Sequence, residues 1–143
     1  MAKSNNLEQG ILKLIYQNID LANIGDAAGL QESATVGSLY IALYQSDPTD
    51  ADAGVEASYT GYARIGVIRS AVGWTLTDST ITNAALITFP TNTGTSQTCT
   101  HLAIRTALTG GDLVYHGALN SALVIENGNI PKFEIGDLAI TEA

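Results

Sequence analysis

The sequence predicts an all-β protein, a jelly-roll-like two-sheet β-sandwich with an N-terminal α-helix. From residue 38 onward, short segments rich in Val, Ile, Thr and Tyr recur between clusters of Gly, Pro, Asn and Asp. This pattern is typical of domains built from many short strands. So many short strands do not form one flat sheet with a stable apolar face, and two facing sheets are the economical arrangement.

The N-terminal helix is expected over residues 4–19. Ser4 or Asn5 can cap it, and Glu8 falls in its first turn. The apolar positions that follow a 3.6-residue spacing are Leu7, Ile11, Leu14 and Ile15. This narrow stripe packs either on the parent domain or, as a terminal arm, on a neighbouring subunit, and both alternatives remain open.

The remaining chain divides into a linker and a strand-rich part. Residues 21–37 are small, polar and glycine-rich, so we predict a helix-and-linker arm over residues 1–37 and a β-sandwich domain over residues 38–143. The predicted strands are Ser38–Gln45, Tyr59–Ser70, Gly73–Thr77, Thr80–Thr82, Ala85–Phe89, Thr98–Leu108, Leu113–Ala118, Ala122–Ile125, Lys132–Ile135 and Leu138–Thr141.

Two of these elements are specified further by their residues. Ser38–Gln45 is apolar on both faces, which predicts a central strand covered on each side. Gly110 and Gly111 supply the positive φ angles of a tight reversal, so the strands that flank them are expected to form a hairpin.

Composition excludes several classes of function. The 143 residues include 6 basic and 14 acidic side chains, a formal net charge of −8, which disfavours nucleic acid and membrane surfaces as partners. No apolar run is long enough to span a bilayer and no signal peptide is expected, so the chain is predicted to stay in a cytoplasm-like compartment. One cysteine and two histidines provide neither a disulfide nor a structural zinc site.

The low share of charged residues points to a protein-covered surface. Only 14% of the residues are charged, against an ordinary share of about 25%. Because Tyr, Trp and Arg are the residue types that dominate binding interfaces, we predict six interface anchors. They are Tyr40, Tyr44, Tyr59, Tyr62, Arg64 and Trp74. The sandwich faces that carry Tyr40, Tyr44 and Tyr62 are expected to be exposed in an isolated chain.

No catalytic motif is present, so we expect no enzyme, no cofactor and no metal. The nucleophile elbow, the phosphate-binding glycine loops and metal-ligand spacings are all missing. His101 and His116 are interpreted as half-exposed strand residues, with a metal pair or a general base beside Asp112 as the less favoured alternative. Cys99 is interpreted as a small, semi-buried residue rather than a nucleophile paired with His101.

An acidic loop follows the first predicted strand. Asp47, Asp50, Asp52 and Glu56 lie within ten residues, an oxygen-rich composition that calcium also prefers. The ligand spacing of a calcium loop is incomplete, however. A solvated loop, or one that contacts a basic partner, is therefore the favoured interpretation.

A series of short stretches matches the successive landmarks of one protein family. They are Leu39–Tyr44, Ser46–Pro48, Gly61–Arg64, Asn83–Pro90, Thr100–Ile104, Thr109–Leu119 and Gly136–Thr141. On these residues, the part of the chain from 38 to 141 resembles a family of small tailed-bacteriophage virion proteins, labelled head decoration (cement) or tail-fibre proteins. The resemblance implies a jelly-roll-like fold and no catalytic residues, and it offers no counterpart for the helix at 4–19.

The function expected from these observations is structural. We predict a capsid decoration (cement) protein on the capsid exterior of the virion, which binds and stabilises the shell of the major capsid protein and is itself a homo-oligomer, a dimer or trimer. A tail or fibre component is the alternative within the same class. A carbohydrate-binding β-sandwich for host attachment, with Trp74 or Tyr59 exposed, is the alternative from another class.

Overall fold

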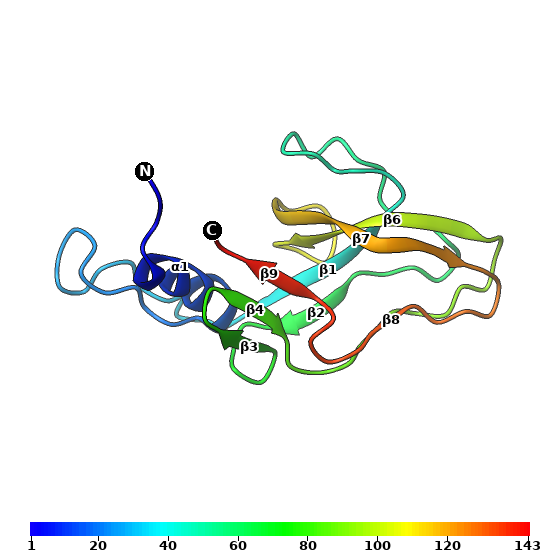
Figure 1. Cartoon of the computed structure of the whole chain (residues 1–143). Coiled ribbons are helices and arrows are strands. Elements are labelled where there is room, and N and C mark those ends of the chain that lie inside the picture. Colours follow the sequence, from blue (N-terminus) through cyan, green and yellow to red (C-terminus); the bar gives the residue numbers. More distant parts are fainter. The chain divides into compact units, whose positions relative to one another are not determined.

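The computed structural model describes residues 1–143 and consists mostly of antiparallel strands with one short N-terminal helix (Figure 1). The predicted all-β class with an N-terminal helix is confirmed, and the strand content is consistent with a two-sheet sandwich. None of its helices has the length and apolar character that crossing a membrane requires.

The chain folds into two compact units, each assembled from separate stretches. The first, called here the helix unit, comprises Met1–Gly37, Ile68–Ile87 and Phe133–Ala143. The second, the sheet unit, comprises Ser38–Val67 and Thr88–Lys132. The predicted division into an arm over residues 1–37 and a domain over residues 38–143 stays a prediction.

The helix unit begins with α1 (Asn5–Leu12), which Ser4 caps by accepting a hydrogen bond from the backbone N–H of Leu7 at 3.3 Å. The helix then widens into a π-helical turn, η1 (Lys13–Gln17), and ends at Asn18 with a φ of 53°. The helix predicted over 4–19 is therefore present, but its last turn is not α-helical. At the C-terminal end of the helical segment, backbone carbonyl oxygens of η1 accept hydrogen bonds from the guanidinium of Arg69.

A small sheet and an aromatic pair form the core of the helix unit. The sheet has the order β3 (Trp74–Thr77), β4 (Thr80–Asn83), β9 (Ala139–Thr141). Trp74 is fully buried and meets the ring of Tyr16 edge-on, with ring centroids 4.7 Å apart. The buried residues of the helical segment are Gly10, Leu12 and Tyr16, so the predicted stripe is not the buried face. The stripe residues Leu7, Ile11, Leu14 and Ile15 are half-buried, and both alternatives for what they pack against stay predictions.

The sheet unit contains a four-stranded antiparallel sheet in the order β2-β1-β6-β7 (Figure 1). The strands are β1 (Ser38–Tyr44), β2 (Ile65–Ile68), β6 (Gln97–Arg105) and β7 (Leu113–Ile125). Strand β1 is central and buried from Ile41 onward on both faces, as predicted. The predicted β6–β7 hairpin is also confirmed, with Gly110 and Gly111 at φ values of 63° and 68°.

Several predicted strands differ from the structure. The strand expected over Tyr59–Ser70 is reduced to β2, because Gly61 adopts a φ of 100° and the N–H of Tyr62 donates to the Tyr59 carbonyl at 2.9 Å, which makes a turn. The segments expected at Leu113–Ala118 and Ala122–Ile125 are one strand, since the residues between them are accommodated as a bulge opposite Thr100.

Short strands complete the fold. Strands β5 (Ile87–Thr88) and β8 (Lys132–Phe133) pair in a two-stranded sheet. Each is two residues long, shorter than the predicted Ala85–Phe89 and Lys132–Ile135.

Candidate functional site

The acidic loop, residues 46–56, joins β1 to the segment before β2 and protrudes beyond the strands of the sheet unit (Figure 1). Its base is closed by backbone hydrogen bonds. Gln45 N–H donates to the Val55 carbonyl at 2.8 Å, and Ala57 N–H donates to the Leu43 carbonyl at 2.8 Å. The Ser46 hydroxyl also accepts a bond from Val55 N–H at 2.9 Å. The loop therefore begins and ends at a fixed place on β1.

Arg64 holds the C-terminal end of the acidic loop. Its Nε and one terminal nitrogen each donate at 2.7 Å to the two carboxylate oxygens of Glu56, a bidentate pair. The other terminal nitrogen donates to the carbonyls of Ala107 and Gly110, both at 2.7 Å. With 9% of its surface exposed, Arg64 links the loop to the β6–β7 turn from a buried position.

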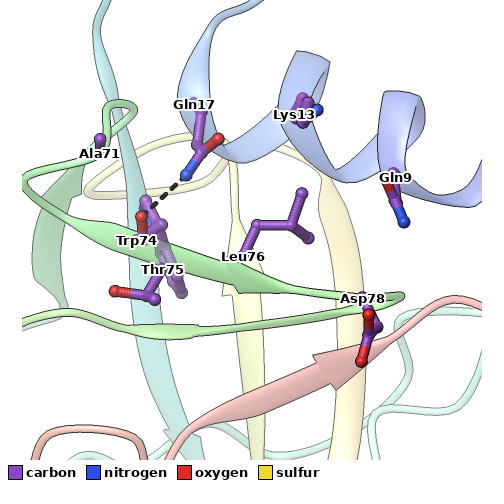
Figure 2. A pocket seen from close by; sticks show the side chains of 8 residues that line it. All are labelled: Gln9, Lys13, Gln17, Ala71, Trp74, Thr75, Leu76 and Asp78. Carbon is purple, nitrogen blue, oxygen red and sulfur yellow. Dashed lines mark hydrogen bonds between the residues drawn. The ribbon is translucent and has the colours of Figure 1, made fainter.

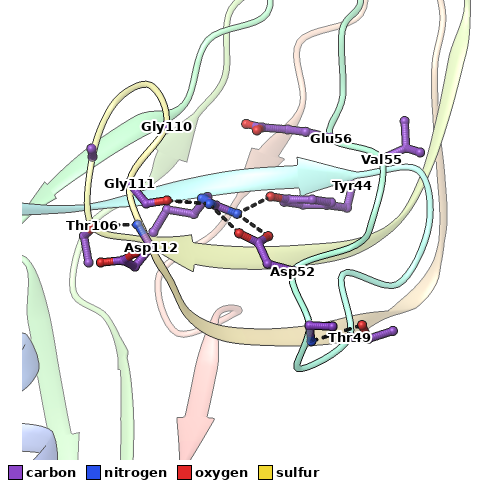
Figure 3. Close-up of polar contacts among 12 residues, drawn as sticks. Tyr44, Thr49, Asp52, Val55, Glu56, Thr106, Gly110, Gly111 and Asp112 are labelled. Carbon is purple, nitrogen blue, oxygen red and sulfur yellow. Dashed lines mark hydrogen bonds and ion pairs between the residues drawn. The ribbon is translucent and has the colours of Figure 1, made fainter.

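Arg105 holds the tip of the same loop at Asp52. Figure 3 shows Asp52 beside Tyr44. Its two terminal nitrogens donate to the carboxylate oxygens of Asp52 at 2.6 and 2.8 Å. They also donate to the hydroxyl of Tyr44 at 2.8 Å and to the carbonyl of Gly111 at 2.7 Å. Both arginines thus connect the loop with the β6–β7 turn, so the two segments are fixed to one another.

These contacts shift the protonation of the carboxyl groups. The hydrogen bonds from Arg105 lower the pKa of Asp52 below its ordinary value. For Glu56, burial alone would raise the pKa, but the hydrogen bonds from Arg64 and Tyr62 together outweigh burial, and the pKa is lowered. Both loop carboxylates are therefore ionised at neutral pH and held by permanently charged partners.

Within the sheet unit, Tyr62 bonds to the acidic loop at Glu56, and Tyr59 packs against Tyr62. The Tyr62 hydroxyl donates to Glu56 Oε1 at 2.8 Å and accepts from the backbone N–H of Leu43 at 3.1 Å. Tyr59 donates to the Pro90 carbonyl at 2.9 Å, and burial raises its pKa to about 12. The two rings meet edge-on with centroids 5.3 Å apart. Both phenols are hydrogen-bonded structural groups rather than acids.

Both histidines face the acidic loop. The two ring nitrogens of His116 lie 3.2 Å from Asp47 Oδ1 and 3.2 Å from Asp50 Oδ1, while His101 Nε2 lies 3.9 Å from Asp47 Oδ2. Their side chains are 24% and 20% exposed, which confirms the interpretation as half-exposed strand residues. Their carboxylate partners come from the loop rather than from Asp112. No group of three or more His, Cys, Asp or Glu side chains is placed to hold a metal ion.

The remaining reactive side chain is Cys99, which is fully buried. Burial raises the pKa of its thiol to about 11, so the thiolate is scarce at neutral pH. The Nδ1 of His101 lies 2.9 Å from the hydroxyl of Thr100. The geometry therefore matches the interpretation of Cys99 as a packed residue.

The predicted interface anchors fall into two groups in the single chain. Tyr40 and Tyr62 are half-buried. The buried members are Tyr44, Tyr59, Arg64 and Trp74, which are between 0% and 9% exposed. Use of these six residues as interface anchors stays a prediction, but the buried four already have partners or packing inside their own unit.

Two expectations of exposure are wrong. Tyr44 is only 2% exposed because Arg105 and the acidic loop cover its hydroxyl, so its face is not open in an isolated chain. Trp74 is fully buried and Tyr59 is 5% exposed. The exposed aromatic surface on which sugar binding was predicted to depend is therefore absent at both positions.

An open pocket of about 600 Å³ lies in the helix unit, between the helical segment and β3 (Figure 2). The amide of Gln17 reaches across one end and donates to the Trp74 carbonyl at 2.9 Å. The lining residues are Gln9, Lys13, Gln17, Ala71, Trp74, Thr75, Leu76 and Asp78. This lining mixes amides with one positive and one negative charge, and it contains neither a paired acid and base nor a cluster of metal ligands.

The pairing of Arg64 and Arg105 with the acidic loop was not predicted from the sequence. A signal was present. Both arginines lie on otherwise apolar segments, in a chain with only six basic residues, and the same domain carries a loop with four carboxylates. A buried arginine requires hydrogen-bond acceptors, and the acidic loop provides four carboxylates in the same domain.

Comparison with known families gives a match, which covers nearly the whole chain. A family model described as Podophage GP4 fiber I protein gp80 matches residues 3–141. The match includes the N-terminal helix, for which the predicted resemblance had no counterpart. No curated protein matches the sequence.

Proposed function

The chain belongs to the Podophage GP4 fiber I protein gp80 family, and from this premise we propose that it is a subunit of a phage fibre that acts by binding other virion proteins. The family match over residues 3–141 is the observation that carries the proposal. The family match supports a structural role in the virion of a tailed phage. Fibre and capsid decoration are finer alternatives, and the family description favours the fibre.

The acidic loop supports a binding role. Arg64 and Arg105 fix the loop at its end and near its tip, so little conformational entropy remains to be lost when a partner binds. Asp50 is fully exposed at the tip, and Val55 is 56% exposed. A rigid loop with a carboxylate at its tip suits a basic patch on a neighbouring protein.

The proposed partners are proteins alone. We propose self-association to a dimer or trimer, and contact with a neighbouring fibre protein. In the decoration alternative the partner is the major capsid protein. The net charge of −8 disfavours nucleic acid and anionic membranes, and the role requires no catalytic step, cofactor or metal.

The location is tested by counting copies in purified virions against the major capsid protein and by immunogold labelling. The fibre proposal expects a copy number far below that of the major capsid protein, with gold at the tail or its fibres. A copy number comparable to the capsid protein, with gold over the head, would replace the fibre with capsid decoration. Absence from the particle would overturn both.

The binding role of the acidic loop is tested by incorporation of variants into particles. Asp50→Lys reverses the charge at the loop tip without touching either arginine, and it should reduce incorporation strongly. Glu126→Lys, an equal charge change at an exposed site elsewhere in the sheet unit, is the matched control and should leave incorporation unchanged. Equal incorporation of the two variants would show that the loop is not a contact.

A further inference from the structure

Strand β7 is an edge strand that lacks most of the usual protection against pairing. It ends the sheet order β2-β1-β6-β7, so no strand pairs with its outer side. Natural edges are shortened or carry lysine or proline to prevent pairing with another chain. At the opposite edge β2 has only 4 residues, whereas β7 has 13 and contains no Asp, Glu, Lys, Arg or Pro.

Gly117, within this edge, has no explanation inside its own chain. It pairs in register with Leu102 of β6, and its φ is not positive, so neither a bulge nor an unusual backbone angle requires glycine. A Cβ placed on Gly117 would meet no atom within 4 Å. By contrast, a Cβ on Gly66 of the β2 edge would lie 3.2 Å from the ring of Tyr40.

A glycine inside a strand often marks a place where another backbone comes close. Two register irregularities bound the region around Gly117, one between Ile104 and Arg105 of β6 and one between Cys99 and His101. Between them Tyr115–Ala118 is regular, and the exposed Ala118 follows Gly117 with a small side chain. The free edge therefore has regular backbone pairing from Tyr115 to Ala118 and small side chains at Gly117 and Ala118.

We propose that β7 pairs through this free edge, at Gly117, with β7 of a second copy of the chain, antiparallel and about a two-fold axis. Antiparallel pairing of one strand with itself is self-complementary, as a two-fold interface requires. Strand β7 itself contains no acidic or basic residue, so no charged side chain of one β7 strand lies opposite one of the other. This pairing rests on the proposed function in one respect, the self-association named there, and it specifies the surface through which two copies associate.

The first experiment measures self-association of the full chain by sedimentation equilibrium. The wild-type chain is expected to form a dimer, and Gly117→Lys is expected to weaken the dimer by at least about tenfold, because two added ammonium groups face each other near the axis. Val72→Lys is the matched control: it adds the same charge at a site that is 77% exposed, and it should leave the dimer unchanged. Thermal unfolding of Gly117→Lys at low concentration should match the wild type, since the protomer has room for the side chain.

The second experiment is hydrogen exchange at low and high protein concentration. Amides of β7 should become protected as concentration rises, while those of the central strand β1 should not change. A wild-type chain that stays monomeric, or a dimer equally stable in Gly117→Lys and wild type, would overturn the proposal. Because these measurements use the purified chain, their failure is separate from failure of the fibre proposal, which is decided by copy number and labelling in virions.

Discussion

The helix unit and the sheet unit are each held by buried or half-buried arginines, but the acceptors differ. In the helix unit, Arg69 donates to the carbonyl oxygens of Ile15 at 2.6 Å, Leu14 at 2.7 Å and Val36 at 3.3 Å. In the sheet unit, Arg64 and Arg105 each bind a carboxylate on two oxygens and a carbonyl of the β6–β7 turn.

This difference has physical consequences for the two units. Backbone carbonyls do not titrate, so the contacts of Arg69 are independent of pH. Carboxylates do titrate, and their pairing with arginine contributes stability only while they are ionised. The arginine contacts that depend on the ionisation of a carboxylate therefore lie in the unit that presents the protruding acidic loop.

The largest effect is expected from Arg64→Ala. The substitution leaves the Glu56 carboxylate and two carbonyls without their donor, and loss of one partner of a buried pair costs about 3–5 kcal/mol. Because the Glu56 side chain is 26% exposed, we expect about 3 kcal/mol, measured by urea unfolding.

The matched variant is Arg69→Ala in the helix unit. It removes bonds from a charged donor to carbonyls that lie nearer to water, and about 1.5–2 kcal/mol is expected. Equal losses for the two variants would contradict the distinction between carboxylate and carbonyl acceptors. Arg64→Lys should fall between wild type and Arg64→Ala, since an ammonium cannot reproduce the bidentate geometry.

A second pair of variants compares buried asparagines, one from each unit. In the helix unit, the Asn83 amide donates to the Ala85 and Glu134 carbonyls, both at 2.8 Å, and accepts from Leu138 N–H at 3.0 Å. In the sheet unit, Asn92 donates to the Thr95 and Ile125 carbonyls at 2.9 and 2.8 Å and accepts from Gly94 N–H at 2.8 Å.

Replacement of either asparagine by alanine leaves buried backbone groups unpaired. We expect each variant to lose about 2 kcal/mol of unfolding free energy. Similar losses would show that the two units differ only in their ionic contacts. A loss below about 0.5 kcal/mol for one of them would mean that water replaces the amide in that unit.

The third prediction concerns acid. The folded-state pKa values of Asp52 and Glu56 are lowered, so both groups stabilise the fold above their unfolded pKa values, near pH 4, and this stability is lost as the pH falls through the folded values. Hydrogen exchange between pH 5 and 3, corrected for intrinsic rates, should show residues 46–56 opening before η1. Simultaneous opening of both segments would show that the acidic loop is not held by its ionised carboxylates. In Asp52→Asn the loop should already be less protected at pH 5.

Much of the fold follows from local patterns in the sequence. The Ser4 cap, the both-faces-apolar strand β1 and the Gly110-Gly111 reversal are each encoded within a few residues, and the structure contains all of them. The strand predicted over Tyr59–Ser70 failed, because apolar alternation continues through a turn that depends on the φ of Gly61. Alternation alone does not report such an angle.

The candidate site was less accessible from the sequence because it is made by contacts between distant residues. Asp52 and Arg105 are 53 positions apart, and only the closed loop brings them together. The same holds for Trp74, whose burial depends on the aromatic ring of Tyr16 in the helical segment. From the sequence alone, an aromatic residue on a short strand is as compatible with burial as with exposure, because the side chain that packs against it is not known.

The smallest effects are expected from two serine hydroxyls that each accept one backbone hydrogen bond, one in each unit. Ser4 caps α1 at 3.3 Å in an exposed position, and Ser46 accepts from Val55 N–H at 2.9 Å at the base of the acidic loop. Ser4→Ala should cost about 0.5 kcal/mol, the low end for an N-cap, because the bond is long and water competes for the N–H. Ser46→Ala should cost about 1 kcal/mol, because its bond is shorter and helps to close the loop. Urea unfolding would contradict this ranking if Ser4→Ala lost more unfolding free energy than Ser46→Ala. The N-cap of α1 would then contribute more to stability than the hydrogen bond at the base of the acidic loop.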